Sequence, residues 1–221
     1  MKTRQAEADP RGAFSQAFES VAAAILALFP PLSEVEQRIS LALYRLLARG
    51  DAVPADRLAR TTVGVPAAEV ERILAHWPNV HRSPDGAVIG YGGLAIQPTR
   101  HRIQLGKRIV YGWCAWDTLF LPELLAQRVR VGSTCPVSGE AISLDVGPQG
   151  VDARGRQPRV SFVAPDPQQA AQDIVKSFCR FVHFFASEEA GAQWVAQHPG
   201  AVLATLEEAW ALGRRRNKQR Y

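Results

Sequence analysis

Three side chains in this sequence have the types and spacing that thiol and proton chemistry require. Cys114 and Asp117 stand three residues apart in the aromatic segment 111–122. If that segment is helical, one face carries the thiol and the carboxyl, roughly 5–6 Å apart at Cβ. Cys179 stands in a second aromatic run, SFCRFVHFFAS. A thiolate is a soft, strong metal ligand, and a carboxyl shielded from water keeps its proton at neutral pH. We expect the two segments to meet in space and form one site.

Three kinds of site use these groups only in part. A structural zinc site needs four nitrogen or sulfur ligands, usually in closely spaced pairs, and the sequence has no CxxC or HxxxH pair. A cysteine nucleophile needs a histidine base. The histidine near a cysteine is His183, in an apolar run typical of a buried structural residue. A redox pair of Cys114 and Cys179 leaves Asp117 without a role.

A fourth kind of site uses all three groups. A thiophilic metal such as Hg(II) prefers thiolates, and two thiolates satisfy it well. Cleaving a carbon–mercury bond needs electron-rich ligands that weaken the bond and an acid that delivers a proton to the departing carbon. Cys114, Cys179 and Asp117 supply both. Aromatic neighbours suit an apolar organic group and help to keep the carboxyl protonated.

Three stretches resemble the organomercurial lyase (alkylmercury lyase) family: YGWCAWDTLFLP, VGSTCPVSGEAISL and SFCRFVHFFAS. The resemblance covers most of the chain except its extreme N-terminus. It implies that Cys114 and Cys179 are the catalytic cysteines, that Asp117 is the catalytic aspartate, and that Cys135 is structural. Many members carry a second cysteine directly after the position of Cys179, where this sequence has Arg180.

The activity that the resemblance implies is protonolytic cleavage of alkyl- and arylmercury compounds, a detoxification reaction that yields the hydrocarbon and Hg(II). Cys114 and Cys179 would bind the mercury, while Asp117, near the metal, would relay the proton. Mercury is then part of substrate and product, and no cofactor is expected. The implied partners are an organomercurial substrate, cytosolic thiols and a mercuric reductase that receives the Hg(II).

Composition indicates a cytoplasmic protein that makes no membrane contact. The 221-residue chain is 47% hydrophobic, enough for a packed core, and its formal net charge is +5. Widely spaced cysteines and a polar N-terminus argue against a secreted disulfide framework. The apolar run 21–29 is too short to cross a bilayer. The basic cluster at 214–220 is expected to be a solvated, frayed terminus rather than a nucleic-acid contact.

Residues 1–90 are expected to form an N-terminal helical, winged-helix-like domain. The pattern predicts helices at 13–29, from Ser33 with a Ser33/Glu36 capping box, at 55–60 and at 66–77, then a hairpin to residue 91. Such a unit can bind DNA, or it can serve as a packing or lid domain. The last helix carries two acids and only Arg72 as a firm base, so we expect packing and no nucleic-acid partner. The alternative function is a mercury- or redox-sensing regulator, which has no need of Asp117.

Residues 91–221 are expected to form the catalytic domain. The pattern predicts short strands at 94–96, 101–105, 108–111, 128–133, 141–146, 160–163 and 181–185, a loop at 147–158, and helices at 167–177, at 188–197 and from Thr205 towards Gly213. The predicted fold class is therefore α+β: a helical winged-helix-like domain, then short, mostly antiparallel strands with flanking helices.

Overall fold

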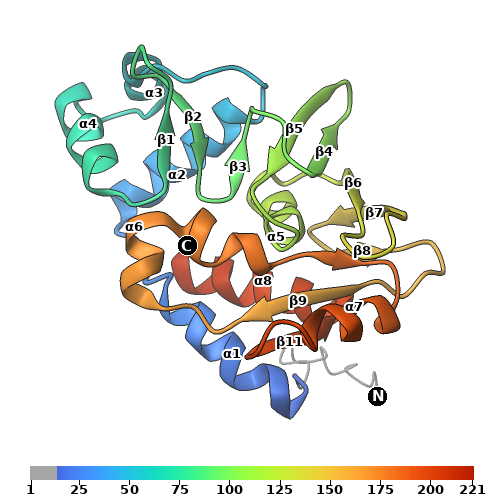
Figure 1. Cartoon of the computed structure of the whole chain (residues 1–221). Coiled ribbons are helices and arrows are strands. Elements are labelled where there is room, and N and C mark those ends of the chain that lie inside the picture. Colours follow the sequence, from blue (N-terminus) through green and yellow to red (C-terminus); the bar gives the residue numbers. More distant parts are fainter. Residues whose placement is uncertain (1–13) are drawn as a thin grey trace, which may run out of the picture.

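The computed structural model describes residues 14–221, and the start of the helix predicted at 13–29 lies outside them. The first part of the chain is helical (Figure 1). Its elements are α1 (Gln16–Ala27), α2 (Glu34–Leu47), α3 (Ala55–Thr61), α4 (Ala67–His76) and the hairpin of β1 (Val80–Arg82) and β2 (Val88–Tyr91). The predicted order of helices and hairpin is confirmed.

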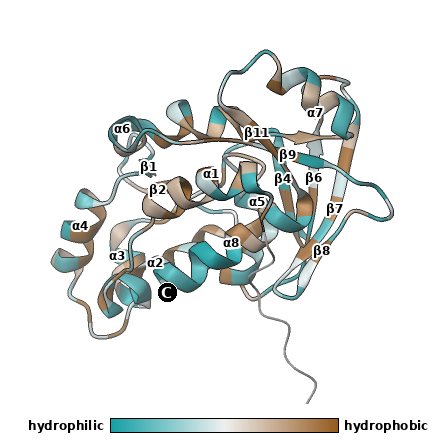
Figure 2. Ribbon diagram, turned by 90° about the horizontal axis from the view of Figure 1, so that it is seen from below, coloured by the Kyte–Doolittle hydropathy of each residue, from teal (hydrophilic) through white to brown (hydrophobic). Residues whose placement is uncertain are grey.

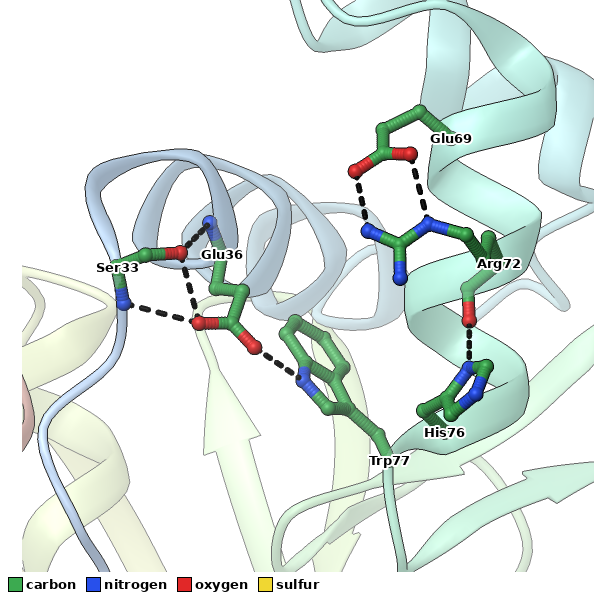
Figure 3. Close-up of polar contacts among 6 residues, drawn as sticks. All are labelled: Ser33, Glu36, Glu69, Arg72, His76 and Trp77. Atoms are coloured by element: carbon green, nitrogen blue, oxygen red, sulfur yellow. Dashed lines mark hydrogen bonds and ion pairs between the residues drawn. The ribbon is translucent and has the colours of Figure 1, made fainter.

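The capping box predicted at the start of α2 is present. Oγ of Ser33 accepts from the backbone N–H of Glu36, and the Glu36 carboxylate accepts from the Ser33 N–H at 2.9 Å. The same carboxylate accepts from Nε1 of Trp77 at 3.3 Å. Figure 3 shows these contacts joining the start of α2 to the end of α4. The Glu36 side chain therefore caps α2 and also links it to the end of α4.

The second part of the chain begins in the same sheet as the hairpin. The sheet adds β3 (Leu94–Ala95), β4 (His101–Leu105), β5 (Arg108–Gly112), β6 (Val129–Thr134), β7 (Ala141–Gly147) and β8 (Gly150–Asp152), in the order β1-β2-β3-β5-β4-β6-β7-β8. Its strand pairs are antiparallel. The prediction that 147–158 is entirely loop was wrong, because residues 150–152 turn back and pair with β7.

A smaller sheet, β10-β9-β11, holds the later strands β9 (Arg159–Val163), β10 (Phe184–Phe185) and β11 (Ala201–Thr205). Helices α5 (Asp117–Leu124), α6 (Pro167–Ser177), α7 (Glu188–Val195) and α8 (Leu206–Arg220) flank the sheets. The strand predicted at 181–185 was wrong in its first half, since Cys179–Phe181 is a 3₁₀ helix, η1. Ser161 explains the break: its Oγ donates to the carbonyl of Phe181 and accepts from the N–H of His183. These bonds occupy groups that a strand would use in its ladder.

The last helix corrects two predictions about the C-terminus. It continues past Gly213 to Arg220, because Gly213 lets α8 approach α5: a Cβ there would lie 2.8 Å from Cβ of Phe120. The basic cluster is therefore not a frayed terminus. Figure 2 shows the end of α8 as largely hydrophilic, yet Arg216 is only 2% exposed. The helix is held by tertiary packing along one face, which a local hydropathy pattern does not reveal.

The side chain of Trp116, just before α5, links α5 to the smaller sheet and to α8. It is 1% exposed, and its ring makes edge contacts with the rings of Phe120, Phe162 and Phe178. Its Nε1 donates to the carbonyl of Ala209 in α8 at 3.0 Å. Edge-to-face packing of this kind orients rings as well as burying them. The same residue range, 14–221, holds no helix with both the length and the apolar character that crossing a membrane requires.

Candidate active site

The turn between β5 and α5 carries two of the predicted site residues. Cys114 lies in a bend before the helix, and Asp117 is the first residue of α5. The backbone N–H of Cys114 donates to Oδ2 of Asp117 at 2.6 Å. An acidic side chain in a first helical turn commonly accepts a free N–H from the residue three before it. The thiol and carboxyl are thus brought together by a turn and not, as the spacing suggested, by one continuous helical face.

The third predicted residue reaches the same place from the other side. Cys179 is the first residue of η1, and only Phe178 separates it from the end of α6. The N–H of Ala115 donates to the carbonyl of Val182 at 3.2 Å, which ties the turn around Cys114 to the segment after Cys179. The bonds from Ser161 hold this segment against β9. Backbone contacts therefore set the relative position of the two cysteines.

Cys114, Asp117 and Cys179 form one buried cluster. One ligand atom from each, the two Sγ atoms and a carboxylate oxygen, lies within 4.8 Å of the others. The three residues are 0%, 5% and 6% exposed, and the cysteines are free thiols. Two sulfur atoms at this separation can hold one soft metal ion, and the adjacent carboxyl can carry a proton. The cluster offers three ligands, whereas a structural zinc site takes four.

Two glycines that the sequence analysis did not single out enclose the carboxyl of Asp117. Gly93 has φ +100°, and a Cβ there would lie 2.7 Å from Cγ of Asp117. A Cβ at Gly112 would lie 2.9 Å from Cγ2 of Thr118 and 3.3 Å from Cβ of Asp117. Any larger residue would push into the carboxyl or its turn. The signal for Gly93 was the Gly92–Gly93 pair between two apolar runs, which we interpreted only as part of the boundary between the two domains.

Burial controls the protonation of the cluster. It raises the pKa of Asp117 to about 7, although the hydrogen bonds with Cys114 and the charge of Arg216 act in the opposite direction. Burial also raises the pKa of the Cys114 thiol, and the hydrogen bond to Cys179 and the carboxylate add to this. For Cys179, the hydrogen bond with Cys114 lowers the pKa, but burial and Asp117 outweigh it and the net direction is upward. At neutral pH the thiols are protonated and the carboxyl is close to its midpoint.

The remaining candidates lie outside the cluster. Cys135 is buried in the turn between β6 and β7, where its Sγ accepts from the N–H of Ser138 at 3.5 Å. His183 packs edge-on against Phe185 and Trp194, and within residues 14–221 its Nδ1 has no hydrogen-bond partner. Burial lowers the pKa of His183 to about 4. It is therefore a neutral ring among aromatic residues.

The N-terminal part of the chain contacts two segments next to the cluster, at Trp113 and at Gly92. The ring of Trp113 stacks on the ring of His81 in β1, with centroids 4.6 Å apart. The hydroxyl of Tyr44 in α2 donates to the carbonyl of Gly92 at 2.8 Å, next to the glycine that touches Asp117. The helical part thus supports one wall of the cluster.

Known proteins resemble the chain across both parts. A helix-turn-helix domain of alkylmercury lyase matches residues 33–92, and an alkylmercury lyase family model matches residues 94–217. The crystal structure of the mercury-bound form of MerB2 is similar in fold, with a TM-score of 0.69 and 26% identity, over 92% of this chain and 98% of that one.

Curated relatives agree with the family model. Alkylmercury lyase of Staphylococcus epidermidis is 38% identical over 78% of this chain and 78% of its own length. Alkylmercury lyase of Pseudomonas putida is 37% identical over 77% of this chain and 79% of its own length. Both relatives and the family model cover most of the region that holds the buried cluster. The chain therefore belongs to the alkylmercury lyase family.

Proposed function

We propose that this protein cleaves the carbon–mercury bond of alkyl- and arylmercury compounds by protonolysis, with Cys114, Cys179 and Asp117 as its catalytic residues. The observation that carries the proposal is a buried carboxyl within 4.8 Å of two free thiols. The names of the relatives and the mercury-bound form of MerB2 support the same reaction class. Two thiols alone are enough to bind mercury without cleaving the carbon–mercury bond, whereas the carboxyl adds the acid that a lyase needs.

The first step is capture of the substrate by a thiol. An organomercurial arrives as R–Hg–SR′, bound to a small thiol. Cys114 forms a sulfur–mercury bond while the bond to SR′ breaks, and the Cys114 proton leaves with the departing group as R′SH. The high pKa of the buried thiol favours this concerted exchange, because a free thiolate at Cys114 would be poorly solvated.

The second step breaks the carbon–mercury bond. Cys179 binds mercury and passes its proton to Asp117, which delivers it to the carbon. A carbon–hydrogen bond forms as the carbon–mercury bond breaks, so R–H leaves and Hg(II) stays on the two thiolates. Mercury keeps its oxidation state throughout. A carboxyl with a pKa of about 7 can both accept and donate a proton at neutral pH, which suits a relay.

Release of Hg(II) needs other thiols. Two thiolates hold Hg(II) tightly, so cytosolic thiols or a mercuric reductase would take the ion by ligand exchange. Free cysteines and thiol partners both belong in a reducing compartment, which favours the cytoplasm. The proposed reaction balances without an organic cofactor.

The proposed division of labour assigns catalysis to residues 91–221 and a packing role to residues 1–90. The hydrogen bond of Tyr44 to Gly92 and the stacking of His81 on Trp113 support this role. Two basic side chains of α4 and the hairpin are paired: Arg72 binds Glu69 through two hydrogen bonds, and Arg82 forms an ion pair with Glu71 (Figure 3 shows the first pair). Paired cations are poor ligands for a phosphate backbone.

Hydrocarbon release tests the proposal. The purified chain is incubated with methylmercury and excess thiol, and methane in the headspace is measured by gas chromatography. We expect methane from the parent protein and none above background from Cys114→Ser or Cys179→Ser. Cys135→Ser is the matched control, because it removes a buried thiol outside the cluster and should leave methane release unchanged.

The relay role of Asp117 is tested separately. Asp117→Asn keeps a carbonyl oxygen that can accept the Cys114 N–H, but its amide can neither take up nor release a proton at neutral pH. We expect bound mercury and a loss of methane release of at least about a hundredfold, within the usual range for a lost acid–base catalyst. Methane release at the parent rate would remove Asp117 from the mechanism. Mercury binding without any methane from the parent would instead indicate a trap or sensor.

A further inference from the structure

A cavity lies beside Gly92. It has a volume of about 270 Å³, and none of the residues of the Cys114 cluster lines it. It opens between α1, α2, the segment after α4, α6 and α8. Its size is near the lower limit for small-molecule pockets. Alanines that are exposed on the surface, Ala27 in α1 and Ala171 in α6, contribute to its wall.

Arg216 brings an unpaired buried charge to this cavity. The side chain is 2% exposed, and its Nε has no hydrogen-bond partner among residues 14–221. Its NH1 donates to the side chain of Asn217, and its guanidinium lies over the rings of Phe29 and Phe120. Within that same range no carboxylate forms an ion pair with it. Its charge acts on the Asp117 carboxyl without forming an ion pair, so the guanidinium is still able to bind an anion from the cavity.

Part of the cavity wall is aromatic. Trp77 stacks on Tyr91 with ring centroids 5.1 Å apart, and Tyr91 packs against Tyr44 at 5.0 Å. The hydroxyls of both tyrosines already donate within the protein, to Gly92 and Ser40, so the rings present mainly apolar surface. Arg220 is the second cation in the wall, and no lining residue is acidic. The cavity therefore combines a planar apolar surface with positive charge.

We propose that this cavity binds a small aromatic carboxylate, with the carboxylate at Arg216 and the ring against Trp77, Tyr91 and Tyr44. The carboxylate matches the guanidinium fork, which can donate two parallel hydrogen bonds. The ring replaces water on the aromatic wall. None of the residues of the thiol cluster lines the site, although the charge of Arg216 also acts on Asp117. Gly92 lines the cavity, and the next residue, Gly93, contacts Asp117. A ligand in the cavity is therefore separated from the proposed acid by this pair of glycines.

Benzoate is the probe for this proposal, and benzyl alcohol is its uncharged counterpart of similar shape. Titration calorimetry and thermal unfolding of the full chain measure the binding of each. We expect benzoate to bind about tenfold or more tightly than benzyl alcohol, because hydrogen bonds to charged groups are stronger than neutral ones. Equal affinities, or no binding of benzoate at millimolar concentration, would overturn the proposal.

Two variants of α8 distinguish a specific contribution of Arg216 to benzoate binding from an effect of the protein's net charge. Arg216→Gln should weaken benzoate binding at least about tenfold, since it removes the charge-assisted bonds. Lys218→Gln is the matched control: it removes one positive charge from the same helix at an exposed position and should leave the affinity unchanged. Equal weakening by both variants would mean that benzoate responds only to the overall charge, which contradicts the proposal.

A third variant covers the case in which Arg216→Gln does not fold. Ala171→Leu adds bulk at the exposed edge of the cavity and leaves every charge in place, and it should abolish benzoate binding. The organic group of a mercurial held at the thiols can also carry a carboxylate, so binding of benzoate at the thiol cluster must be distinguished from binding in the cavity. Benzoate is therefore titrated into the protein loaded with Hg(II) and into Cys114→Ser/Cys179→Ser. Unchanged affinity in both supports a separate site, and loss in either places benzoate at the thiol cluster and overturns the proposal.

Discussion

Gly93 packs directly against the carboxyl group of Asp117. The glycine has φ +100°, and a Cβ at its position would lie 2.7 Å from Cγ of Asp117. Its carbonyl also accepts from the N–H of Trp113 at 2.9 Å, so the strand pair places backbone against the proposed acid. This contact excludes water from one side of the carboxyl, and exclusion of water is what raises its pKa.

Gly93→Ala should therefore damage the site and the fold together. Positive φ costs a non-glycine residue about 1–2 kcal/mol, and the overlap with Asp117 adds overpacking, for a total of about 3 kcal/mol or more. Methane release should fall sharply because the carboxyl must move. Gly86→Ala is the matched control, with φ +85° and nothing within 4 Å of the added Cβ. It should lose only the strain energy and keep full activity; equal losses in the two variants would refute the packing argument.

The stability of the protein should depend on pH through Asp117. Its pKa is about 7 in the folded protein and close to its ordinary value of 3.8 in the unfolded chain. Between these values the folded state holds a proton that the unfolded state has lost, so stability falls as pH rises. Asp117→Asn removes this dependence. The variant should gain stability relative to the parent by about 4 kcal/mol between pH 4 and pH 7, at about 1.4 kcal/mol per pKa unit.

Denaturant unfolding of both proteins across that pH range measures the difference. Asp51→Asn, at an exposed position after α2, is the control and should track the parent. A constant difference between Asp117→Asn and the parent at every pH would mean that Asp117 has the same pKa in the folded and unfolded protein, so that burial does not hold it as an acid.

Ser161 should act as a positioning residue for Cys179. Its Oγ bonds the carbonyl of Phe181 at 2.6 Å and the N–H of His183 at 3.0 Å. Ser161→Ala leaves two partly buried backbone groups without this partner, which should cost about 1–3 kcal/mol of unfolding free energy. The second sulfur–mercury bond should form more slowly, so methane release should fall while the first capture of mercury continues.

Stopped-flow measurement of mercury capture, alongside methane release, separates these effects. Ser133→Ala is the control, since Ser133 is another buried strand serine but bonds His101 at 3.0 Å and not the η1 segment. If Ser161→Ala slows capture and methane release equally, the residue supports the fold in general and does not position Cys179 in particular.

The helical N-terminal part should not bind DNA specifically. Its last helix, α4, has Arg72 paired with Glu69, and the hairpin after it has Arg82 paired with Glu71. A recognition helix needs free cations for phosphates and base edges. Gel-shift titration with random and selected duplexes at low and physiological salt should show at most weak, non-specific retention. A sequence-specific complex at physiological salt would support the regulator as a real alternative.

Local sequence features predicted much of the fold. The Ser33/Glu36 box starts α2, Asp166 caps α6, and alternating apolar residues predict β4 at its observed bounds. These features depend on neighbours along the chain, such as a side-chain oxygen near a free N–H or a period of two in a strand. The Cys114–Asp117 pairing is also local, because a single turn connects them through the bond at 2.6 Å.

The position of Cys179 and the burial of Arg216 depend on tertiary structure, because no local sequence pattern encodes them. Cys179 meets Cys114 only because Ala115 bonds Val182 and Ser161 holds η1. Arg216 looks like its basic neighbours in sequence, yet packing of α8 on α5 buries it. The sequence by itself determined which side chains could do the chemistry and where helices and strands begin. The distances between them, and the burial that sets their protonation, come from contacts between segments far apart in the chain, whose energies depend on the whole packed core.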